Sequence, residues 1–427
     1  MIFVKYNCEL QELMMTKKLK IWIATIGEPV PSDGKDVRLL RSGQFAFWLG
    51  EREHIVRFIT NSVDHYARKQ RFHKTTEVAY SKNINLTFLW ARTYKKSLSL
   101  ARYFSHYDAQ KSFEIWIEQS QNKPDIIIAS YPTYQLSNAL AKYAIKNRVP
   151  ILIDCRDAWP DIFYESTPRA IKPFLSLYIF FYTRRVQKLF MKSTGILAHC
   201  SEFLDLALKK ASRNQKHTDK VFHFTYPTSI KPSSNFKKNN DNEIRVIYAG
   251  TLTKRNDLQQ FISAFKKTED AERNLKLIIA GTGDDYGRLN SISNMKYLNI
   301  EFMGWLSLEE LVSEFANSDF ALLPYLRSDF KMSLPNKFVE YLANSLPVIC
   351  VGNSAFASLV TTNKCGIVLD SNIGDLNHSL EAALSKVEKS QIRTFSKNAK
   401  ALYDEKFNQN VVFKDMEAHL MQIVDER

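Results

Sequence analysis

The stretch that decides the fold reads Phe320-Ala-Leu-Leu-Pro-Tyr-Leu-Arg-Ser-Asp-Phe-Lys-Met-Ser-Leu-Pro-Asn-Lys-Phe-Val-Glu-Tyr-Leu-Ala-Asn-Ser-Leu-Pro-Val-Ile-Cys350. An apolar run over residues 320–323 predicts a buried strand that Pro324 ends, and residues 346–351 predict a second one. Between them, a polar loop leads to a short helix near Pro335, because proline fits the first turn of a helix. This order places the start of the helix in the mouth of a parallel sheet, where its backbone N–H groups and positive dipole end bind anions.

The short helix carries a candidate binding side chain. Phe338 and Leu342 belong to its apolar side, and Glu340 and Tyr341 are expected towards the other side. Glu340 lies one turn in and can accept hydrogen bonds from a pair of hydroxyl groups such as those of a ribose. The alternative is that Glu340 pairs with Lys337 on a solvated face.

Length and composition indicate a soluble protein of two domains. A chain of 427 residues is too long for one ordinary core, and 45% hydrophobic with 24% charged residues is typical of globular proteins. The five scattered cysteines include no CxxC pair, which favours reduced thiols in the cytoplasm over disulfides or structural zinc. Residues 1–18 form an N-terminal extension that does not resemble a signal peptide, and no segment approaches the roughly 20 apolar residues of a membrane span.

The net charge of +14 leaves three kinds of partner open: nucleic acid, an anionic membrane surface or a phosphorylated substrate. Residues 162–192 interleave aromatic and basic side chains. This pattern fits a helix that lies on an anionic bilayer, or an ordinary core helix with a charged outer face.

The first half of the chain predicts a doubly wound domain over residues 19–230. Strands are expected at 20–25, 54–60, 125–130, 149–154 and 195–201, with helices between them. Polar segments follow three of these strands at their carboxyl ends, at residues 27–34, 61–75 and 155–161. In an open sheet that edge binds ligands. No GxGxxG follows the first strand, so a dinucleotide cofactor is not predicted.

The second half repeats this pattern. A polar linker over residues 231–243 precedes a second doubly wound domain, 244–393, and terminal helices, 394–427. Lys254 and Arg255 follow its first strand, and Gly281-Thr-Gly283 follows its second. Together with the Ser333–Asn336 turn and Glu340, these residues outline a site for a nucleotide diphosphate.

At these residues the chain resembles the retaining GT-B glycosyltransferases of family four. Three segments of the second half carry the resemblance: Tyr248-Ala-Gly-Thr-Leu252, Ile300-Glu-Phe-Met-Gly304 and Leu334-Pro-Asn-Lys-Phe-Val-Glu-Tyr-Leu-Ala343. In the first half, Gly27-Glu-Pro29, Arg38-Leu-Leu-Arg41, Asp64-His65 and Arg156-Asp-Ala-Trp-Pro160 resemble a subgroup that makes surface polysaccharides. The likeness spans about residues 19–400.

The resemblance implies an α/β protein of GT-B architecture, in which two Rossmann-like domains face each other across a cleft. The expected catalytic residues are Arg156, Lys254 and Arg255. The expected donor-binding residues are Gly250, Thr251, Gly281, Gly283, Gly304, Trp305, Ser333, Leu334, Asn336, Lys337 and Glu340. The expected acceptor-side residues are Gly34, Arg41, Asp64, His65 and Asp157. The family has a further glutamate where this chain has Met332, which leaves the contact to the transferred sugar unassigned.

The implied reaction moves a sugar from a nucleotide diphosphate sugar, UDP-linked by expectation, to an acceptor hydroxyl with retention and without a metal or other cofactor. The implied acceptor is a polyprenyl-diphosphate-linked saccharide in capsule, O-antigen or exopolysaccharide synthesis, handled in the cytoplasm or peripherally at the inner membrane face. A sugar-nucleotide epimerase shares the architecture and the donor site. A nucleic-acid-binding protein fits the charge, but its Lys and Arg residues are spread over both halves without a recognisable module.

Overall fold

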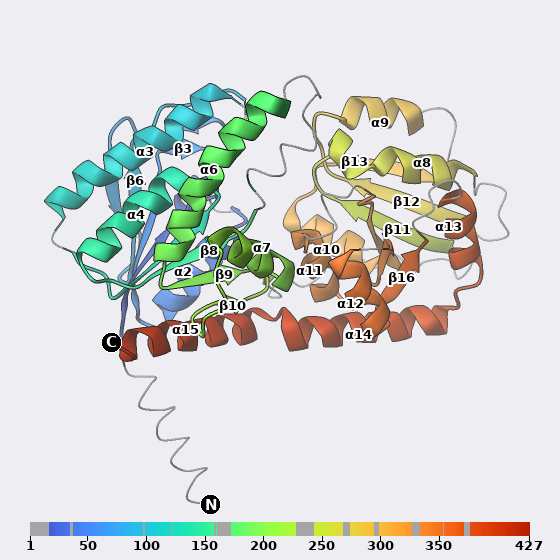
Figure 1. Cartoon of the computed structure of the whole chain (residues 1–427). Helices are drawn as coiled ribbons and strands as arrows, with labels where there is room; N and C mark the ends of the chain where they lie inside the picture. Colours follow the sequence, from blue (N-terminus) through green and yellow to red (C-terminus); the bar gives the residue numbers. More distant parts are fainter. Residues whose placement is uncertain are drawn as a thin grey trace, which may run out of the picture. The chain divides into compact units, whose positions relative to one another are not determined.

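The computed structural model describes residues 17–34, 37–96, 99–120, 122–157, 159, 172–227, 243–267, 274–293, 299–326, 334–352, 354–370 and 376–427. The chain forms two compact units, Met1–Phe222 with Phe413–Arg427, and His223–Val412 (Figure 1). Each unit has its own sheet with helices against it, as two Rossmann-like domains require.

The sheet of the first unit has the strand order β10-β9-β8-β7-β1-β2-β6-β5. The parallel strands are β1 (Lys20–Ala24), β2 (Ile55–Asn61), β6 (Ile84–Leu89), β7 (Ile126–Tyr131), β8 (Ile151–Cys155), β9 (Gly195–Ala198) and β10 (Lys220–Val221). Strand β5 (Thr76–Ala79) pairs antiparallel with β6, and a small hairpin joins β3 (Val63–Asp64) to β4 (Lys69–Gln70). All residues of β7 and β8 are buried, as expected for central parallel strands covered on both faces.

Helices cover this sheet on both faces. The helices are α2 (Arg41–Glu51), α3 (Leu100–Gln119), α4 (Tyr134–Lys146), α6 (Lys172–Lys192) and α7 (Ser201–Ala211). Helix α3 packs against α4, α4 against α6, and α6 against α7, so these four helices form one layer. Helix α2 packs on β1, β2 and β6.

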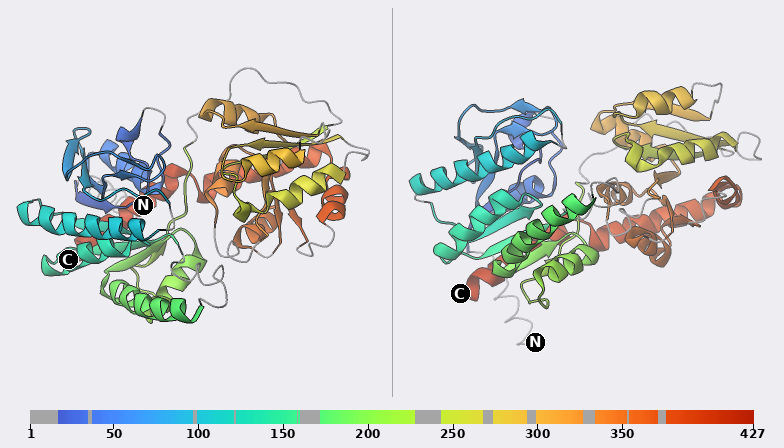
Figure 2. Two further views of the ribbon diagram at one scale, coloured as in Figure 1. Left: turned by 90° about the horizontal axis from the view of Figure 1, so that it is seen from above. Right: turned by 45° about the horizontal axis from the view of Figure 1, so that its top comes forward.

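The second unit contains a parallel sheet of order β13-β12-β11-β14-β15-β16. Its strands are β11 (Glu243–Ala249), β12 (Asn274–Ala280), β13 (Ile300–Gly304), β14 (Phe320–Leu323), β15 (Val348–Val351) and β16 (Gly366–Leu369). Its helices are α8 (Leu258–Lys267), α9 (Tyr286–Ser293), α10 (Leu308–Ala316), α11 (Asn336–Ala343), α12 (Ala355–Asn363), α13 (Leu376–Ser385) and α14 (Lys389–Lys406). Helices α8 and α13 pack together, while α11 and α12 both pack on α14, so the sheet lies between helical layers (Figure 2).

The last helix, α15 (Gln409–Asp425), returns the chain to the first unit. Phe413 is fully buried, and its ring centroid lies 5.1 Å from that of Phe45 on α2. Glu417 accepts hydrogen bonds from the Arg52 Nε at 2.8 Å and lies 2.6 Å from the His54 Nε2. The helix thereby covers part of α2 and completes the core of the first unit.

The burial of the cysteines and the apolar character of the helices can be read from the described segments. The four cysteines of the described segments, Cys155, Cys200, Cys350 and Cys365, are buried and form no disulfide with one another. Burial raises the pKa of the Cys155 thiol to about 12, so it remains protonated at neutral pH. Among the described helices, none combines the length and apolar character needed to cross a bilayer.

The docking of α15 predicts a specific loss of stability. Replacing Phe413 with alanine removes a buried ring and leaves a cavity, which lowers the free energy of unfolding by about 3–5 kcal/mol. Val411→Ala is the matched control, because Val411 lies on the same helix and is exposed. Urea unfolding of both variants measures the difference, and equal stability of the two would contradict this role of Phe413.

Candidate functional site

Donor-site residues predicted for the second unit lie where the order of strand addition reverses in its parallel sheet. Strands β12 and β13 extend the sheet on one side of β11. The next strand in the chain, β14, pairs with the other side of β11. Ligands of doubly wound sheets bind at such a switch point, beyond the carboxyl ends of the strands. Gly250 and Thr251 follow β11 directly at this point, and α11 begins after the segment that follows β14.

The loops after β11, β12 and β13 lie backbone against backbone. The Gly250 N–H donates to the Ala280 carbonyl at 2.8 Å, the Leu252 N–H to Thr282 at 2.9 Å and the Gly281 N–H to Gly304 at 2.6 Å. Gly281 has a φ of +138°, and a Cβ there would lie 2.0 Å from the Gly250 carbonyl oxygen. A side chain at Gly281 would therefore separate the two loops.

Helix α11 is tied to the end of β11 at two successive turns. The Lys337 ammonium donates to the Tyr248 hydroxyl at 2.7 Å and lies 4.2 Å from the centre of the Tyr248 ring. One turn later, the Tyr341 hydroxyl accepts a hydrogen bond of 3.1 Å from the Ala249 N–H. A Cβ at Gly250 would lie 2.1 Å from the Lys337 Nζ, so the glycine makes room for the ammonium group.

The burial of α11 corrects two expectations about the helix. Tyr341 was expected towards its solvated side, but the side chain is fully buried, with its ring 5.6 Å from that of Phe315. Glu340 is 3% exposed, which contradicts a surface ion pair on a solvated face. The eight-residue helix is buried on all sides from Phe338 onward, because helices and strands of its own unit surround it.

The remaining predicted donor residues lie around these loops. Lys254 and Thr251 are exposed, and Lys254 opens a short 3-10 helix, Lys254–Asn256, that also includes Arg255. The pKa of Asp285, two residues after Gly283, is lowered by hydrogen bonds from Arg288 and also by the charge of Lys254. The structure therefore brings Lys254 close to the loop after β12.

Trp305 follows Gly304 at the end of β13 and is 80% exposed. Leu334 is buried and Asn336 is exposed at the first position of α11, with Pro335 at the N-cap. Ser333 and Met332 lie outside the described residues. Among the described residues, no group of three His, Cys, Asp or Glu side chains gathers as a metal ion would require.

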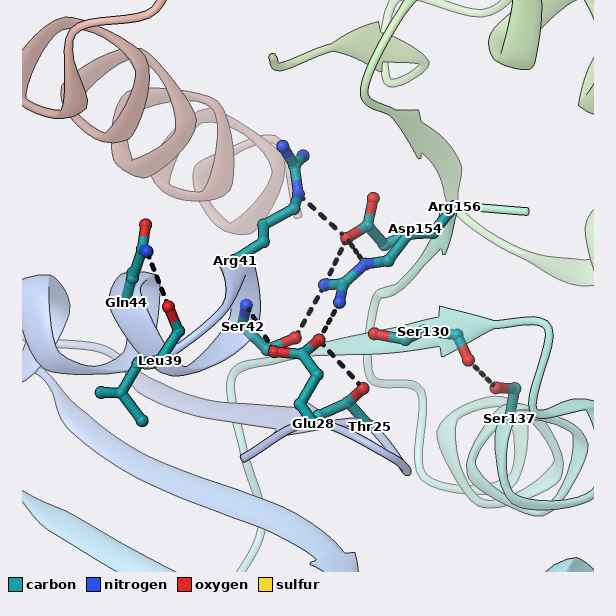
Figure 3. Close-up of polar contacts among 10 residues, drawn as sticks. All are labelled: Thr25, Glu28, Leu39, Arg41, Ser42, Gln44, Ser130, Ser137, Asp154 and Arg156. Carbon is teal, nitrogen blue, oxygen red and sulfur yellow. Dashed lines mark hydrogen bonds and ion pairs between the residues drawn. The ribbon is translucent and has the colours of Figure 1, made fainter. Parts of the chain in front are cut away.

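In the first unit, a buried network of charges lies at the carboxyl ends of β1 and β8 (Figure 3). The Arg156 Nε donates to Asp154 at 2.7 Å, another of its nitrogens donates to the Ser42 hydroxyl at 2.7 Å, and a third donates to Glu28. Arg41 donates to the same Asp154 oxygen at 3.1 Å. Two arginines and two carboxylates thus balance in charge away from water, which is the condition for burying them.

Electrostatics hold Asp154 in its charged form. Burial by itself would raise the pKa of Asp154, but the charges of Arg156 and Arg41 outweigh it and lower the pKa to about 2. The same carboxylates raise the pKa of Arg156 despite its burial. Burial lowers the pKa of Arg41 from its usual high value.

This network changes the interpretation of Arg156. The sequence suggested a contact between Arg156 and donor phosphate or sugar, but in the structure its guanidinium bonds to Glu28, Asp154 and Ser42. We interpret Arg156 as a residue that fixes the loop after β1 against β8, and its contact with a donor stays a prediction. Among the described residues, two buried oxygens beside the network, Asp154 Oδ1 and Ser130 Oγ, have no hydrogen-bond partner.

The other predicted acceptor-side residues lie at the carboxyl edge of the same sheet. The His65 Nδ1 lies 2.6 Å from the Tyr94 hydroxyl, and burial lowers the pKa of His65, with Arg102 and Arg68 adding to the effect. Asp64 accepts hydrogen bonds from the backbone N–H groups of the next turn. Asp157 and Gly34 lie in loops, with Gly34 at the end of a 3-10 helix, Pro31–Asp33.

Sequence reasoning missed four positioning residues: Tyr248, Tyr341, Glu28 and Asp154. Tyr248 and Glu28 stood inside quoted motifs, where their neighbours received the roles. Asp154 is the one charged residue in β8, and that isolated charge is the signal that could have identified it.

Part of the chain matches a known protein family. Residues 230–402 match the family model described as "Glycosyl transferases group 1". A relative from Escherichia coli (strain K12), "Putative colanic acid biosynthesis glycosyltransferase WcaL", is 24% identical over 183 residues. This match covers 42% of the present chain and 45% of WcaL, less than half of that relative's length.

Solved structures share the fold of nearly the whole chain. The sucrose-phosphate synthase of Thermosynechococcus elongatus has a TM-score of 0.71 at 12% identity, with 96% of this chain and 100% of that chain covered. HepE of Anabaena, solved in complex with UDP and glucose, has a TM-score of 0.63 at 13% identity, with 95% and 100% covered. The fold is that of the GT-B glycosyltransferases, as predicted.

The buried network predicts a pH-dependent stability. A carboxylate whose folded pKa is depressed stabilises the fold above its unfolded pKa of 3.8, and the contribution is lost as the pH falls towards 2. Asp154→Asn therefore unfolds more easily than the wild type above about pH 5, and the difference in free energy of unfolding shrinks by about 2 kcal/mol towards pH 2.

Urea unfolding over a pH series measures this difference. Asp425→Asn is the control, because Asp425 pairs with Lys17 on the surface of the same unit, and exposed pairs contribute at most about 1 kcal/mol. A difference between wild type and Asp154→Asn that stays constant with pH would show that the carboxylate charge is not stabilised by the two arginines.

Proposed function

We propose that the protein transfers a sugar from a nucleotide diphosphate sugar to an acceptor hydroxyl. The observation that carries the proposal is the set of glycine loops after β11 and β12, with the start of α11, Lys337 and the buried Glu340 at the same switch point. Backbone amides, a helix N-terminus and cations in one place suit a diphosphate. The group 1 match of residues 230–402 supports the same reaction class.

The diphosphate would lie against the loops after β11 and β12. Lys254 is exposed beside them, and Tyr248 holds the Lys337 ammonium over Gly250. Positive groups placed where negative charge develops on the leaving diphosphate stabilise the transition state more than the ground state. These cations and the helix end can do this work without a metal ion.

The nucleoside would be held by Glu340 and Trp305. A carboxylate can accept hydrogen bonds from both hydroxyls of a ribose, and hydrogen bonds to a charged group are stronger than those between neutral groups. Trp305 offers an exposed ring on which a base can stack. We propose UDP as the nucleotide, in line with the UDP bound to HepE.

The transfer would proceed with retention, with the departing phosphate oxygen as the base that takes the acceptor proton. This route requires no protein nucleophile. The first unit would bind the acceptor at the edge where Arg41, Asp154 and Arg156 hold the loop after β1. We propose a lipid-linked saccharide of surface polysaccharide synthesis as acceptor, supported by the likeness to WcaL.

Variants of the donor site test the proposal after a thermal-shift screen of nucleotide sugars has found the donor. A donor raises the unfolding temperature because it binds the folded state. With that donor, Glu340→Gln is expected to raise KM about 10- to 100-fold, because a hydrogen bond to a charged group is weakened. Lys254→Ala is expected to lower kcat about 100-fold, as the loss of one transition-state contact does.

Lys386→Ala is the control for these variants, since Lys386 is exposed in the same unit and lies outside the site. Turnover that survives both Glu340→Gln and Lys254→Ala unchanged would rule out this donor site. An incubation with donor alone distinguishes the sugar-nucleotide epimerase, because only that enzyme would return an isomerised sugar without an acceptor.

A further inference from the structure

Helix α6 of the first unit carries apolar side chains on two opposite sides. Val186, Leu189 and Phe190 face the interior and are buried. Leu177, Phe180 and Phe181 are 59%, 52% and 58% exposed. These last three, which we call the apolar ridge, are not needed to fill the core, because the opposite side of the helix already does so. Large apolar groups gathered on a surface mark a site of interaction.

The apolar ridge lies among cations. Helix α6 contains Arg184, Arg185 and Lys188, all exposed, and its sequence includes no Asp or Glu. The Arg184 guanidinium lies 5.0 Å from the centre of the Phe180 ring. A partner that fits this surface must therefore offer an apolar region to the ridge and negative charges to the surrounding cations.

Beside the apolar ridge lies a groove between α3, α4 and α6, with a volume of about 440 Å³. Its walls include five tyrosines, Tyr103, Tyr107, Tyr134, Tyr178 and Tyr182, and we call it the tyrosine groove. Three pairs of these rings lie 5.5–5.9 Å apart.

Two cations, Lys142 and Arg185, also line the tyrosine groove, and no carboxylate does among the described lining residues. Arg185 lowers the pKa of Tyr103, Tyr134 and Tyr178, against a larger rise from burial, so its charge reaches all three phenols. Tyrosines with an apolar body and a polar tip suit the boundary between acyl chains and headgroups.

We propose that α6 docks the first unit on an anionic lipid bilayer, with the apolar ridge in the outer acyl region and lipid phosphates at the tyrosine groove. A helix that is apolar and basic on its outer side lies in the plane of such an interface. Leu177 and the long arginine side chains fit this layering better than the flat stacking that nucleic acid bases require. A membrane-docking surface would bring the protein to the proposed lipid-linked acceptor. The docking itself does not depend on the proposed function, which enters only through the identity of the acceptor.

Vesicle sedimentation tests the proposal with the full-length protein and no sugar donor, so its outcome is separate from that of the turnover assays. We expect binding to vesicles that contain phosphatidylglycerol, weak binding to pure phosphatidylcholine, and release at about 0.5 M salt. Phe180→Ser/Phe181→Ser should weaken binding at least about tenfold, from the apolar area lost. Arg184→Gln/Lys188→Gln should weaken it about fivefold for each cation removed.

Two matched double variants are the controls. Ile55→Ser/Tyr80→Ser removes two exposed apolar side chains elsewhere in the same unit, and Lys82→Gln/Lys123→Gln removes two exposed cations there. Both should bind vesicles as the wild type does, and circular dichroism checks that every variant is folded. Equal binding of the α6 variants and their controls would overturn the proposal.

Two other results would overturn it as well. In the first, the wild type does not bind anionic vesicles but self-associates in light scattering, and Phe180→Ser/Phe181→Ser abolishes the association. That result would assign the surface to a second copy of the chain. Salt-sensitive retention of RNA that Arg184→Gln/Lys188→Gln abolishes, without vesicle binding, would assign it to nucleic acid.

Discussion

The second unit depends on the close approach of two loops, in which the Gly281 backbone lies against the Gly250 carbonyl. Any side chain at Gly281 would meet that oxygen at 2.0 Å. Because the loops touch, the ends of β11 and β12 form a narrow rim of backbone groups. Lys337 and Tyr341 then tie α11 to the same strand end, so the start of the helix is held beside this rim.

In the first unit, the loop after the first strand is held in place by buried charged side chains and not by a close approach of glycine backbones. Its switch point lies between β1 and β7, and the loop after β1 is held by Glu28, which bonds to Arg156 and to Ser42. Removing one member would leave its partner charged and buried, which costs about 3–5 kcal/mol. Glu28 thereby ties the loop after β1 to the start of α2 and to Arg156, which follows β8.

The sequence was sufficient to predict the parts of the fold that depend on local pattern. Apolar runs followed by glycine predicted the strands, and the spacing of Gly250, Gly281 and Glu340 placed these residues at one edge. The burial of Tyr341 was missed because the neighbouring Glu340 marked that side of the short helix as polar, whereas the structure buries both residues. The partners of Arg156 were missed because Glu28 is distant in sequence and only the folded sheet brings them together.

The central claim is that the loops after β11 and β12 and the first turn of α11 bind the diphosphate of a nucleotide sugar. Hydrogen–deuterium exchange with and without UDP tests it most directly, because amides that bind phosphate exchange more slowly. The account predicts protection at residues 250–252, 281–285 and 334–340 of the second unit. Unchanged exchange in all three segments at a UDP concentration that raises the unfolding temperature would contradict it.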